Sequence, residues 1–204
     1  LCYSPIKERS LDLGIPVYTP NNLNDDSEVK QQILSLEADI YIVVAFGQIL
    51  PIDILNKPSL GCWNSHASLL PKWRGAAPIQ RSLLNGDLET GVGIMFMEET
   101  LDTGPILMQK SITINDSDNL STLSERLSVL SGDLILNSIQ LISNSKQGNN
   151  NSLKLISQLE IGGEVSYAKM IRKTDYLIEW SDSHVDIIRK IKGLYPNSYT
   201  FWRG

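Results

Sequence analysis

Residues 40–46, Ile-Tyr-Ile-Val-Val-Ala-Phe, are the apolar run that most constrains the fold of this chain. The run is rich in β-branched residues and is apolar on both alternating faces, which is typical of a strand covered on both sides. It is much shorter than the ~18 residues that a membrane-spanning helix needs. We therefore expect it to be a central, buried strand of an α/β domain.

Short apolar runs and amphipathic stretches alternate along the first part of the chain. This order predicts an α/β fold with a Rossmann-like, mostly parallel sheet and flanking helices. An acidic turn at 98–104 joins the last two strands of this part. Besides 40–46, strands are expected at 14–18, 60–66, 91–97 and 105–114, and helices at 27–37, 52–56, 76–84 and 119–142.

The sequence pattern changes after a polar, Asn-rich stretch at 143–152. We predict a first domain over 1–148, a linker over 149–164 and the start of a second domain over 165–204. Within the second domain, a helix over 181–194 and a strand beginning at 199 are expected. Because the chain opens without an initiator Met, we expect a fragment that lacks both ends of a longer protein.

Charge is distributed unevenly, although the net charge is only −5. Residues 165–204 hold 7 Lys/Arg against 4 Asp/Glu, whereas residues 1–164 hold 11 against 19. A basic tail on an acidic body favours contact with a polyanion at one end, but a solvated helix face would explain it equally well. The two cysteines are too few for a disulfide framework and indicate a reducing compartment, and Cys62 is expected to be buried.

The search for catalytic residues is short because the chain has two histidines. His184 stands in a polar helical stretch and is predicted to be a surface residue. His66 ends a predicted strand two residues after Asn64, so both side chains should point to the same side. Asp102 lies in the turn after a neighbouring strand and is expected to reach the same crevice, at the carboxyl ends of the strands.

An amide, an imidazole and a carboxylate suit acyl transfer to an amine without a covalent intermediate. Asn64 can donate a hydrogen bond to a developing oxyanion. His66 can bond the same oxygen or move a proton, and Asp102 can orient His66 or take the proton of the amine. The plainer alternative is that Asn64 and His66 satisfy strand-end hydrogen bonds and that Asp102 only makes a turn.

Several motifs resemble the signature of the folate-dependent formyltransferases. Asn-Ser-His-Ala-Ser-Leu-Leu-Pro at 64–71 precedes Trp-Arg-Gly at 73–75, and Leu-Asp-Thr-Gly-Pro follows at 101–105. Arg-Gly-Ala-Ala-Pro-Ile-Gln-Arg at 74–81 is similar to the branch that formylates methionyl initiator tRNA. Val-Val-Ala-Phe-Gly-Gln-Ile-Leu-Pro at 43–51 is similar to the strand and loop that wall the folate pocket of that branch.

The resemblance implies transfer of a formyl group from 10-formyltetrahydrofolate, as cosubstrate, to the α-amino group of methionyl initiator tRNA. It implies a Rossmann-like catalytic domain followed by a small β-barrel of the OB type, which would begin near residue 165. No metal and no membrane are expected, and we expect a monomer in the bacterial cytoplasm, or in an organelle if the source is eukaryotic. Catalytic positions fall on Asn64, His66 and Asp102, and folate-contacting positions fall on Ser68, Leu69, Leu70 and Pro71.

The resemblance also implies a role for the basic tail, which is to contact tRNA phosphates. Some of Lys169, Arg172, Lys173, Arg189, Lys190 and Lys192 would make those contacts. Lys72, Arg74 and Arg81 are further candidates at the acceptor arm, although Arg74 fits a structural hydrogen-bonding role equally well.

Three other functions remain open at this point. A related enzyme with glycinamide ribonucleotide, an amino sugar or water as acceptor would share the same three catalytic residues. Asp-Thr-Gly at 102–104 is the tripeptide of aspartic proteases, but those sites need two such carboxylates and the chain has one copy. A non-catalytic binding module would be favoured by loss of one of the three residues, and all three are present.

Overall fold

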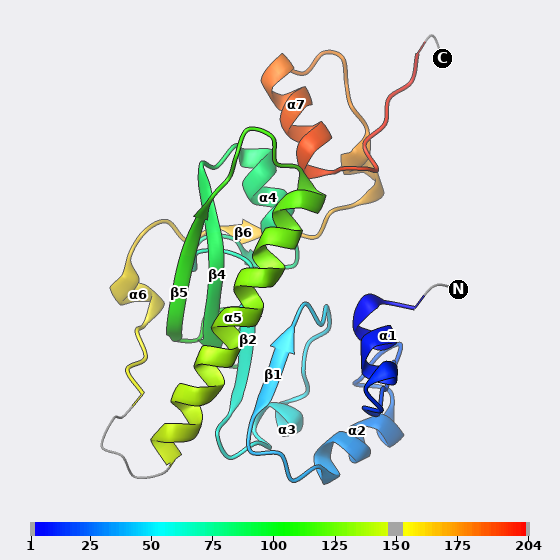
Figure 1. Ribbon diagram of the computed structural model, residues 1–204. Helices are drawn as coiled ribbons and strands as arrows, with labels where there is room; N and C mark the ends of the chain where they lie inside the picture. The colour runs from blue at the N-terminus through cyan, green and yellow to red at the C-terminus, as the bar shows by residue number, and fades with distance from the viewer. Residues whose placement is uncertain (1–2, 147–152, 203–204) are drawn as a thin grey trace.

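The computed structural model describes residues 3–146 and 153–202 and shows a sheet with the long helix α5 across one face (Figure 1). A lobe of three short helices lies beside one end of the sheet, and α4 and α7 lie at the other end. The helices are α1 (Pro5–Asp12), α2 (Ser27–Ser35), α3 (Ile52–Leu55), α4 (Pro78–Asn85), α5 (Leu120–Lys146), α6 (Gln158–Ile161) and α7 (His184–Gly193). The strands are β1 (Tyr41–Val44), β2 (Cys62–His66), β3 (Arg74–Gly75), β4 (Glu89–Phe96), β5 (Ile106–Thr113) and β6 (Tyr167–Ala168).

The main sheet has four strands in the order β1-β2-β4-β5. Strands β1 and β2 are parallel, whereas β4 is antiparallel to both β2 and β5. The α/β class and the flanking helices are confirmed, but the sheet in the described residues is mixed rather than mostly parallel. One of the two antiparallel pairs has a local reason: the turn after β4 is too short for a crossover helix, so β4 and β5 form a hairpin. The other pair, β2 and β4, is antiparallel although α4 lies between these strands in the chain.

The core lies between the sheet and α5. Leu123, Leu127, Leu130 and Leu134, at helical spacing along α5, pack with Trp63, Val92 and Ile94 of the sheet. Burying one such side chain contributes about 1.5–3 kcal/mol to stability. The predicted amphipathic face of the helix is therefore confirmed, and α5 fixes which face of the sheet is closed.

Local signals at the helix ends also match the sequence. Pro78 occupies the first turn of α4, where a missing N–H costs nothing, and Gly86 ends that helix with φ 74°. In α7 the Ser183 side chain accepts a hydrogen bond from the backbone N–H of Asp186, a standard N-cap. His184 begins this helix and is exposed, as predicted.

Two strand predictions fail, and β1 is not central. Residues 15–20 carry no regular structure, so the strand expected at 14–18 is wrong, and α1 was not foreseen. No strand of the described chain pairs with residues 14–18, and their large apolar side chains are mostly exposed. Strand β1 is at the edge of the sheet, so its apolar faces are only partly covered. Near the end of the chain, Tyr199 forms a single bridge with Leu177 instead of beginning a strand.

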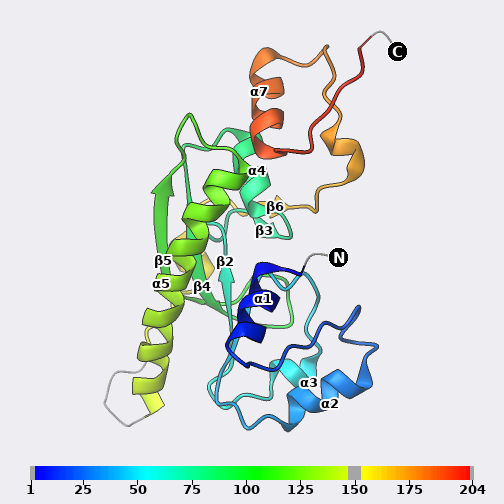
Figure 2. The ribbon, with the colours of Figure 1, turned by 45° about the vertical axis from the view of Figure 1, so that its right-hand side comes forward.

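The segment after residue 153 contacts the main sheet through a bridge between Ile156 and Ile106, and then forms β6 of a separate two-stranded sheet before it reaches α7. Strand β6 pairs in parallel with β3, and Gly193 of α7 packs against Leu83 and Leu84 of α4. Figure 2 shows α7 stacked on α4 from a second side. Residues 149–152 of the predicted linker lie outside the described residues, and the division at 165 into a second, OB-like domain stays a prediction.

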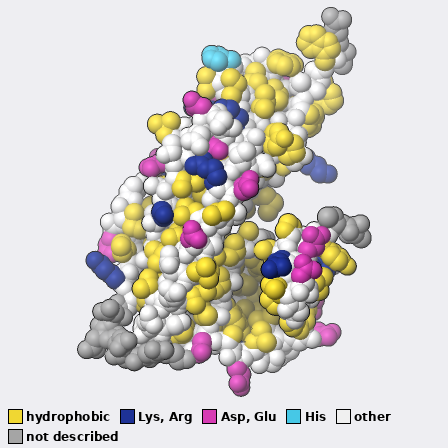
Figure 3. Space-filling view, viewed as in Figure 1, with side chains coloured by type: hydrophobic (Ala, Val, Ile, Leu, Met, Phe, Trp, Pro, Cys, Tyr) yellow, Lys and Arg dark blue, Asp and Glu magenta, His cyan; other side chains and the backbone are white. Residues whose placement is uncertain are grey.

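The surface seen in Figure 3 mixes cationic and anionic side chains, and hydrophobic side chains gather between the α1–α3 lobe and the body. Within residues 3–146 and 153–202, no helix combines the length and apolar character that crossing a membrane requires.

Candidate active site

The alternation of β2 decides which side chains face the site. The Ser65 hydroxyl lies 2.7 Å from the hydroxyl of Ser131 on α5, so Ser65 and Trp63 face the helix. Asn64 and His66 therefore project from the opposite face. The sequence predicted this, because side chains two positions apart on a strand point to the same side. That face is covered by loops and short elements instead of a long helix.

Asp102 reaches this face from the turn between β4 and β5. Because β4 runs antiparallel to β2, the turn starts beside Trp63, at the opposite end of β2 from His66. The turn then folds back, so the three residues meet over the face of the sheet and not beyond its carboxyl edge, where the site was expected. The convergence predicted from the sequence is nevertheless what the structure shows.

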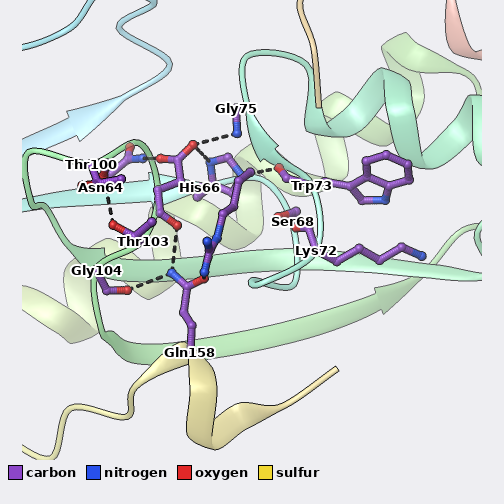
Figure 4. Close-up of polar contacts among 12 residues, drawn as sticks. Asn64, His66, Ser68, Lys72, Trp73, Gly75, Thr100, Thr103, Gly104 and Gln158 are labelled. Carbon is purple, nitrogen blue, oxygen red and sulfur yellow. Dashed lines mark hydrogen bonds and ion pairs between the residues drawn. The ribbon is translucent and has the colours of Figure 1, made fainter. Parts of the chain in front are cut away.

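Asn64 and His66 lie close together in Figure 4, and with Asp102 they form a close polar group. Asn64 Nδ2 lies 3.4 Å from Asp102 Oδ1, and His66 Nδ1 lies 3.7 Å from Asp102 Oδ2. Only 6% of the His66 side chain and 10% of the Asp102 side chain are exposed. Both distances exceed an ordinary hydrogen bond, so a substrate atom placed among the three groups can compete for them.

The other nitrogen of His66 is tied to the backbone. His66 Nε2 lies 2.8 Å from the carbonyl oxygen of Trp73. A carbonyl oxygen only accepts, so Nε2 carries the proton and Nδ1 is the atom that faces Asp102.

Trp73 has φ 62°, a left-handed conformation that bulky residues rarely adopt. It is held there because its N–H donates to Ser166 Oγ at 3.0 Å and its indole N–H donates to Asp87 at 2.7 Å.

The Asp102 turn is anchored at several points. Asp102 Oδ2 accepts a hydrogen bond of 2.8 Å from the backbone N–H of Gly75. The backbone of Asp102 has φ 52°, again left-handed. The side-chain amide of Gln158 donates to the carbonyl oxygens of Asp102 and Gly104, at 2.9 Å each.

The predicted folate-contacting segment lies directly after β2. The Ser68 hydroxyl donates to the carbonyl of Lys72 at 2.6 Å, and the Leu70 side chain packs with Met95 and Ile106. Pro71 is buried, and Leu69 is partly exposed. Ser68 and Leu70 therefore use their side chains internally, and contact with a folate through this segment stays a prediction.

The basic residues near the site are mostly engaged. Lys72 pairs with Asp87 at 2.8 Å, and the Arg74 guanidinium donates twice to Gln158 Oε1, at 3.0 and 2.7 Å. Nε and Nη2 of Arg74 therefore have the structural hydrogen-bonding role that the sequence analysis considered for this residue. A cavity of about 330 Å³ beside them is lined by Trp73, Arg81, Leu84, Asn85, Tyr167 and Lys169.

Five of the six basic residues named in the tail fall into two groups, and the sixth, Arg189, is half-buried on α7. Lys190 donates to the carbonyl of Leu177 and Lys192 to that of Asp116. Lys169, Arg172 and Lys173 are exposed. These three are the better placed for contact with an external polyanion.

Cys62 is buried, as predicted, with 1% of its surface exposed. Burial raises the pKa of its thiol to about 11. It is therefore a neutral, inert thiol at physiological pH.

Sequence reasoning missed two contributors to the site. Gln158 stands in the polar connector, where nothing in the local pattern marks it. The carbonyl of Trp73 is a backbone group, and only its left-handed conformation aims it at His66. Neither can be found from residue type or spacing.

Comparison with known proteins identifies the family. The pattern of the formyl transferase family matches residues 6–139, well over half of the chain. The chain belongs to the formyl transferase family. The three catalytic candidates all fall within the matched part.

A relative from Prochlorococcus marinus (strain NATL2A), named methionyl-tRNA formyltransferase, is 53% identical over 205 residues. The match covers 98% of this chain and 61% of the relative, so the chain spans about three fifths of that protein's length.

Solved structures share the fold at low sequence identity. A 4-N formyltransferase from Francisella tularensis has a TM-score of 0.73 at 22% identity, covering 97% of this chain and 77% of that chain. An N-formyltransferase from Helicobacter canadensis, solved in complex with folinic acid and dTDP-3-aminofucose, has a TM-score of 0.68 at 21% identity. That match covers 91% of this chain and 62% of that chain.

Proposed function

We propose that the protein transfers a formyl group from 10-formyltetrahydrofolate to the α-amino group of methionyl initiator tRNA. The observation that carries the proposal is the meeting of Asn64, His66 and Asp102 on one face of the sheet. An amide N–H, an imidazole nitrogen and a carboxylate within reach of one point suit attack by an amine on a carbonyl carbon.

In the proposed reaction, the amine nitrogen bonds to the formyl carbon and the carbonyl electrons move onto oxygen. Asn64 Nδ2 donates to that oxyanion. Because Nε2 of His66 is occupied by the Trp73 carbonyl, Nδ1 takes the proton of the amine and then donates toward the same oxygen. Collapse of the intermediate breaks the bond to the folate nitrogen, which receives the proton. While His66 Nδ1 carries that proton, Asp102 Oδ2 faces it and stabilises the imidazolium.

A folate is supported as donor by the family and by the Helicobacter canadensis protein, whose structure holds folinic acid. In the present chain the segment from Ser68 to Pro71 borders His66 directly, so its backbone and the partly exposed Leu69 are the groups available to a pterin. We assign folate contact to this segment. The reaction needs no redox step, because the formyl carbon keeps its oxidation state.

The tRNA acceptor is supported by the 53% identity with a relative named for that reaction. The cavity beside Trp73 adds a physical reason, since it combines two aromatic rings, Trp73 and Tyr167, with two cations, Arg81 and Lys169. Aromatic faces stack on bases and cations bind phosphates. We place the reaction in the bacterial cytoplasm, where initiator tRNA is charged and used.

The test is transfer of labelled formyl from 10-formyltetrahydrofolate to methionyl-tRNA by the full-length protein. A dTDP-amino sugar and glycinamide ribonucleotide serve as alternative acceptors in parallel reactions. We expect label in the methionyl-tRNA only. Label in a small amine, with none in the tRNA, would keep the formyl-transfer chemistry and reject the acceptor.

A further inference from the structure

Gln158 is a buried amide that lies far from Asp102 in sequence and touches it in space. It is the first residue of α6, and 4% of it is exposed. Figure 4 shows its side chain pointing from α6 toward the group formed by Asn64 and His66. A polar side chain that is this well buried is normally held by a full set of partners.

Every polar position of the Gln158 amide is used. Nε2 donates one hydrogen bond to the carbonyl of Asp102 and one to that of Gly104, both at 2.9 Å. Oε1 accepts two from the guanidinium of Arg74. Since carbonyls only accept and Arg only donates, these partners allow one orientation of the amide.

The two carbonyls belong to a turn with a demanding backbone. Asp102 is left-handed at φ 52° although it has a side chain. A Cβ on Gly104 would lie 1.8 Å from the carbonyl oxygen of Phe96, so this residue has almost no freedom to shift. Outliers of this kind persist only where the surroundings hold them in place.

The α6 segment itself is firmly attached. Ile156 exchanges two backbone hydrogen bonds of 2.9 Å with Ile106 at the start of β5. Ser157 and Glu160 close a capping box at the first turn of α6. Gln158 thus projects from a fixed support onto the turn.

We propose that Gln158 is a positioning residue for the formyl transfer, acting by clamping the Asp102 turn to Arg74 so that the Asp102 carboxylate faces Asn64, His66 and the Gly75 N–H. The inference rests on the proposed function, because it names how a catalytic carboxylate of that reaction is held. Gln158 touches no reacting atom; it acts through Asp102.

The primary variant is Gln158→Glu in the full-length protein. Glu has the same length and keeps the contact with Arg74, but its carboxylate faces two carbonyl oxygens and cannot donate to them. We expect kcat to fall about 10- to 100-fold, because small misplacements of a catalytic group have effects of this size. KM for 10-formyltetrahydrofolate and for methionyl-tRNA should stay within about threefold, since no substrate contact is removed.

A double-mutant cycle separates positioning from general stability. In an Asp102→Ala background, measured under single-turnover conditions, Gln158→Glu should change the rate less than about threefold. Equal losses in both backgrounds would show that Gln158 does not act through Asp102 and would overturn the inference. So would wild-type kcat in the single variant.

Two controls complete the design. Gln158→Met keeps the length without donors or charge and replaces Gln158→Glu if that variant fails to fold by circular dichroism. Asp118 is a second buried polar residue, 4% exposed, and it accepts hydrogen bonds from Asn115 and Thr122 at the far end of β5. Asp118→Asn should lower the melting temperature without changing kcat. A wild-type protein that formylates a different acceptor would reject the tRNA proposal alone, and the cycle would then be run with that acceptor.

Discussion

Asp102 Oδ2 accepts a hydrogen bond of 2.8 Å from the backbone N–H of Gly75, and this contact joins the turn after β4 to strand β3. Strand β3 in turn pairs with β6, so the carboxylate is connected to the segment that leads to α7. The same oxygen is the one that faces His66 Nδ1. The direction of the carboxylate is therefore set by the backbone around it as well as by its own side-chain torsions.

The two histidines provide a matched pair for testing the site. His66→Ala should lower kcat at least about 100-fold, because it removes the group that moves the proton and helps to hold the oxyanion. His184→Ala should leave kcat unchanged, since His184 is exposed at the start of α7. Asn64→Ala and Asp102→Ala should behave like His66→Ala, with folding checked by circular dichroism. Near-normal turnover in His66→Ala would remove the imidazole from the mechanism.

Gly104 tests how tightly the Asp102 turn is held. A methyl group at this position would lie 1.8 Å from the Phe96 carbonyl oxygen, so Gly104→Ala must displace backbone. We expect a loss of about 1–3 kcal/mol in the free energy of unfolding, together with a fall in kcat.

Gly132→Ala is the control for that substitution. Gly132 lies in α5 with no atom within 4 Å of an added Cβ, and the change should stabilise the protein by about 0.5–1 kcal/mol. Urea denaturation gives both values. A Gly104→Ala protein as stable and active as wild type would show that the turn is free to adjust.

The sequence predicted much of the fold because its signals are local. Two kinds of local signal specify helices without reference to the rest of the chain. One is the pair of end residues of α4, Pro78 in the first turn and Gly86 at the C-cap, and the other is the leucine spacing of α5. Strands are harder, since a strand exists only if another pairs with it. Residues 14–18 have strand composition but no partner in the described chain, and the apolar run at 40–46 forms an edge strand.

The candidate site shows the same contrast between what local sequence signals predict and what depends on distant segments. Asn64 and His66 could be placed together from strand alternation alone, and Asp102 from the position of its turn. The reversal of β4 could not be foreseen, and it moves the meeting point from the sheet edge to the sheet face. Gln158 and the Trp73 carbonyl depend on contacts between distant segments, which residue type and spacing do not reveal.

Cys62 should make stability fall at high pH. Its pKa is raised from 9.0 to about 11 by burial, so between these values the unfolded chain releases the proton while the folded chain keeps it. The contribution of this thiol to the free energy of unfolding should therefore fall by up to about 1.4 kcal/mol per pH unit between pH 9 and pH 11, and it is fully present well below pH 9. Urea denaturation of wild type and Cys62→Ala across this range isolates the effect. Parallel pH profiles for the two proteins would contradict it.

The exposed cations Lys169, Arg172 and Lys173 should contribute to tRNA binding by neutralising phosphates. Replacing all three by Gln should weaken binding of methionyl-tRNA and make the plot of log Kobs against log salt shallower by about 1 for each phosphate that is no longer neutralised. KM for 10-formyltetrahydrofolate should not change, because the substitutions lie outside the folate-contacting segment. Lys57→Gln, an exposed lysine after α3, serves as the control of equal chemistry. An unchanged salt slope in the triple variant would place the tRNA-binding cations elsewhere, since removing cations that neutralise phosphates must alter counterion release.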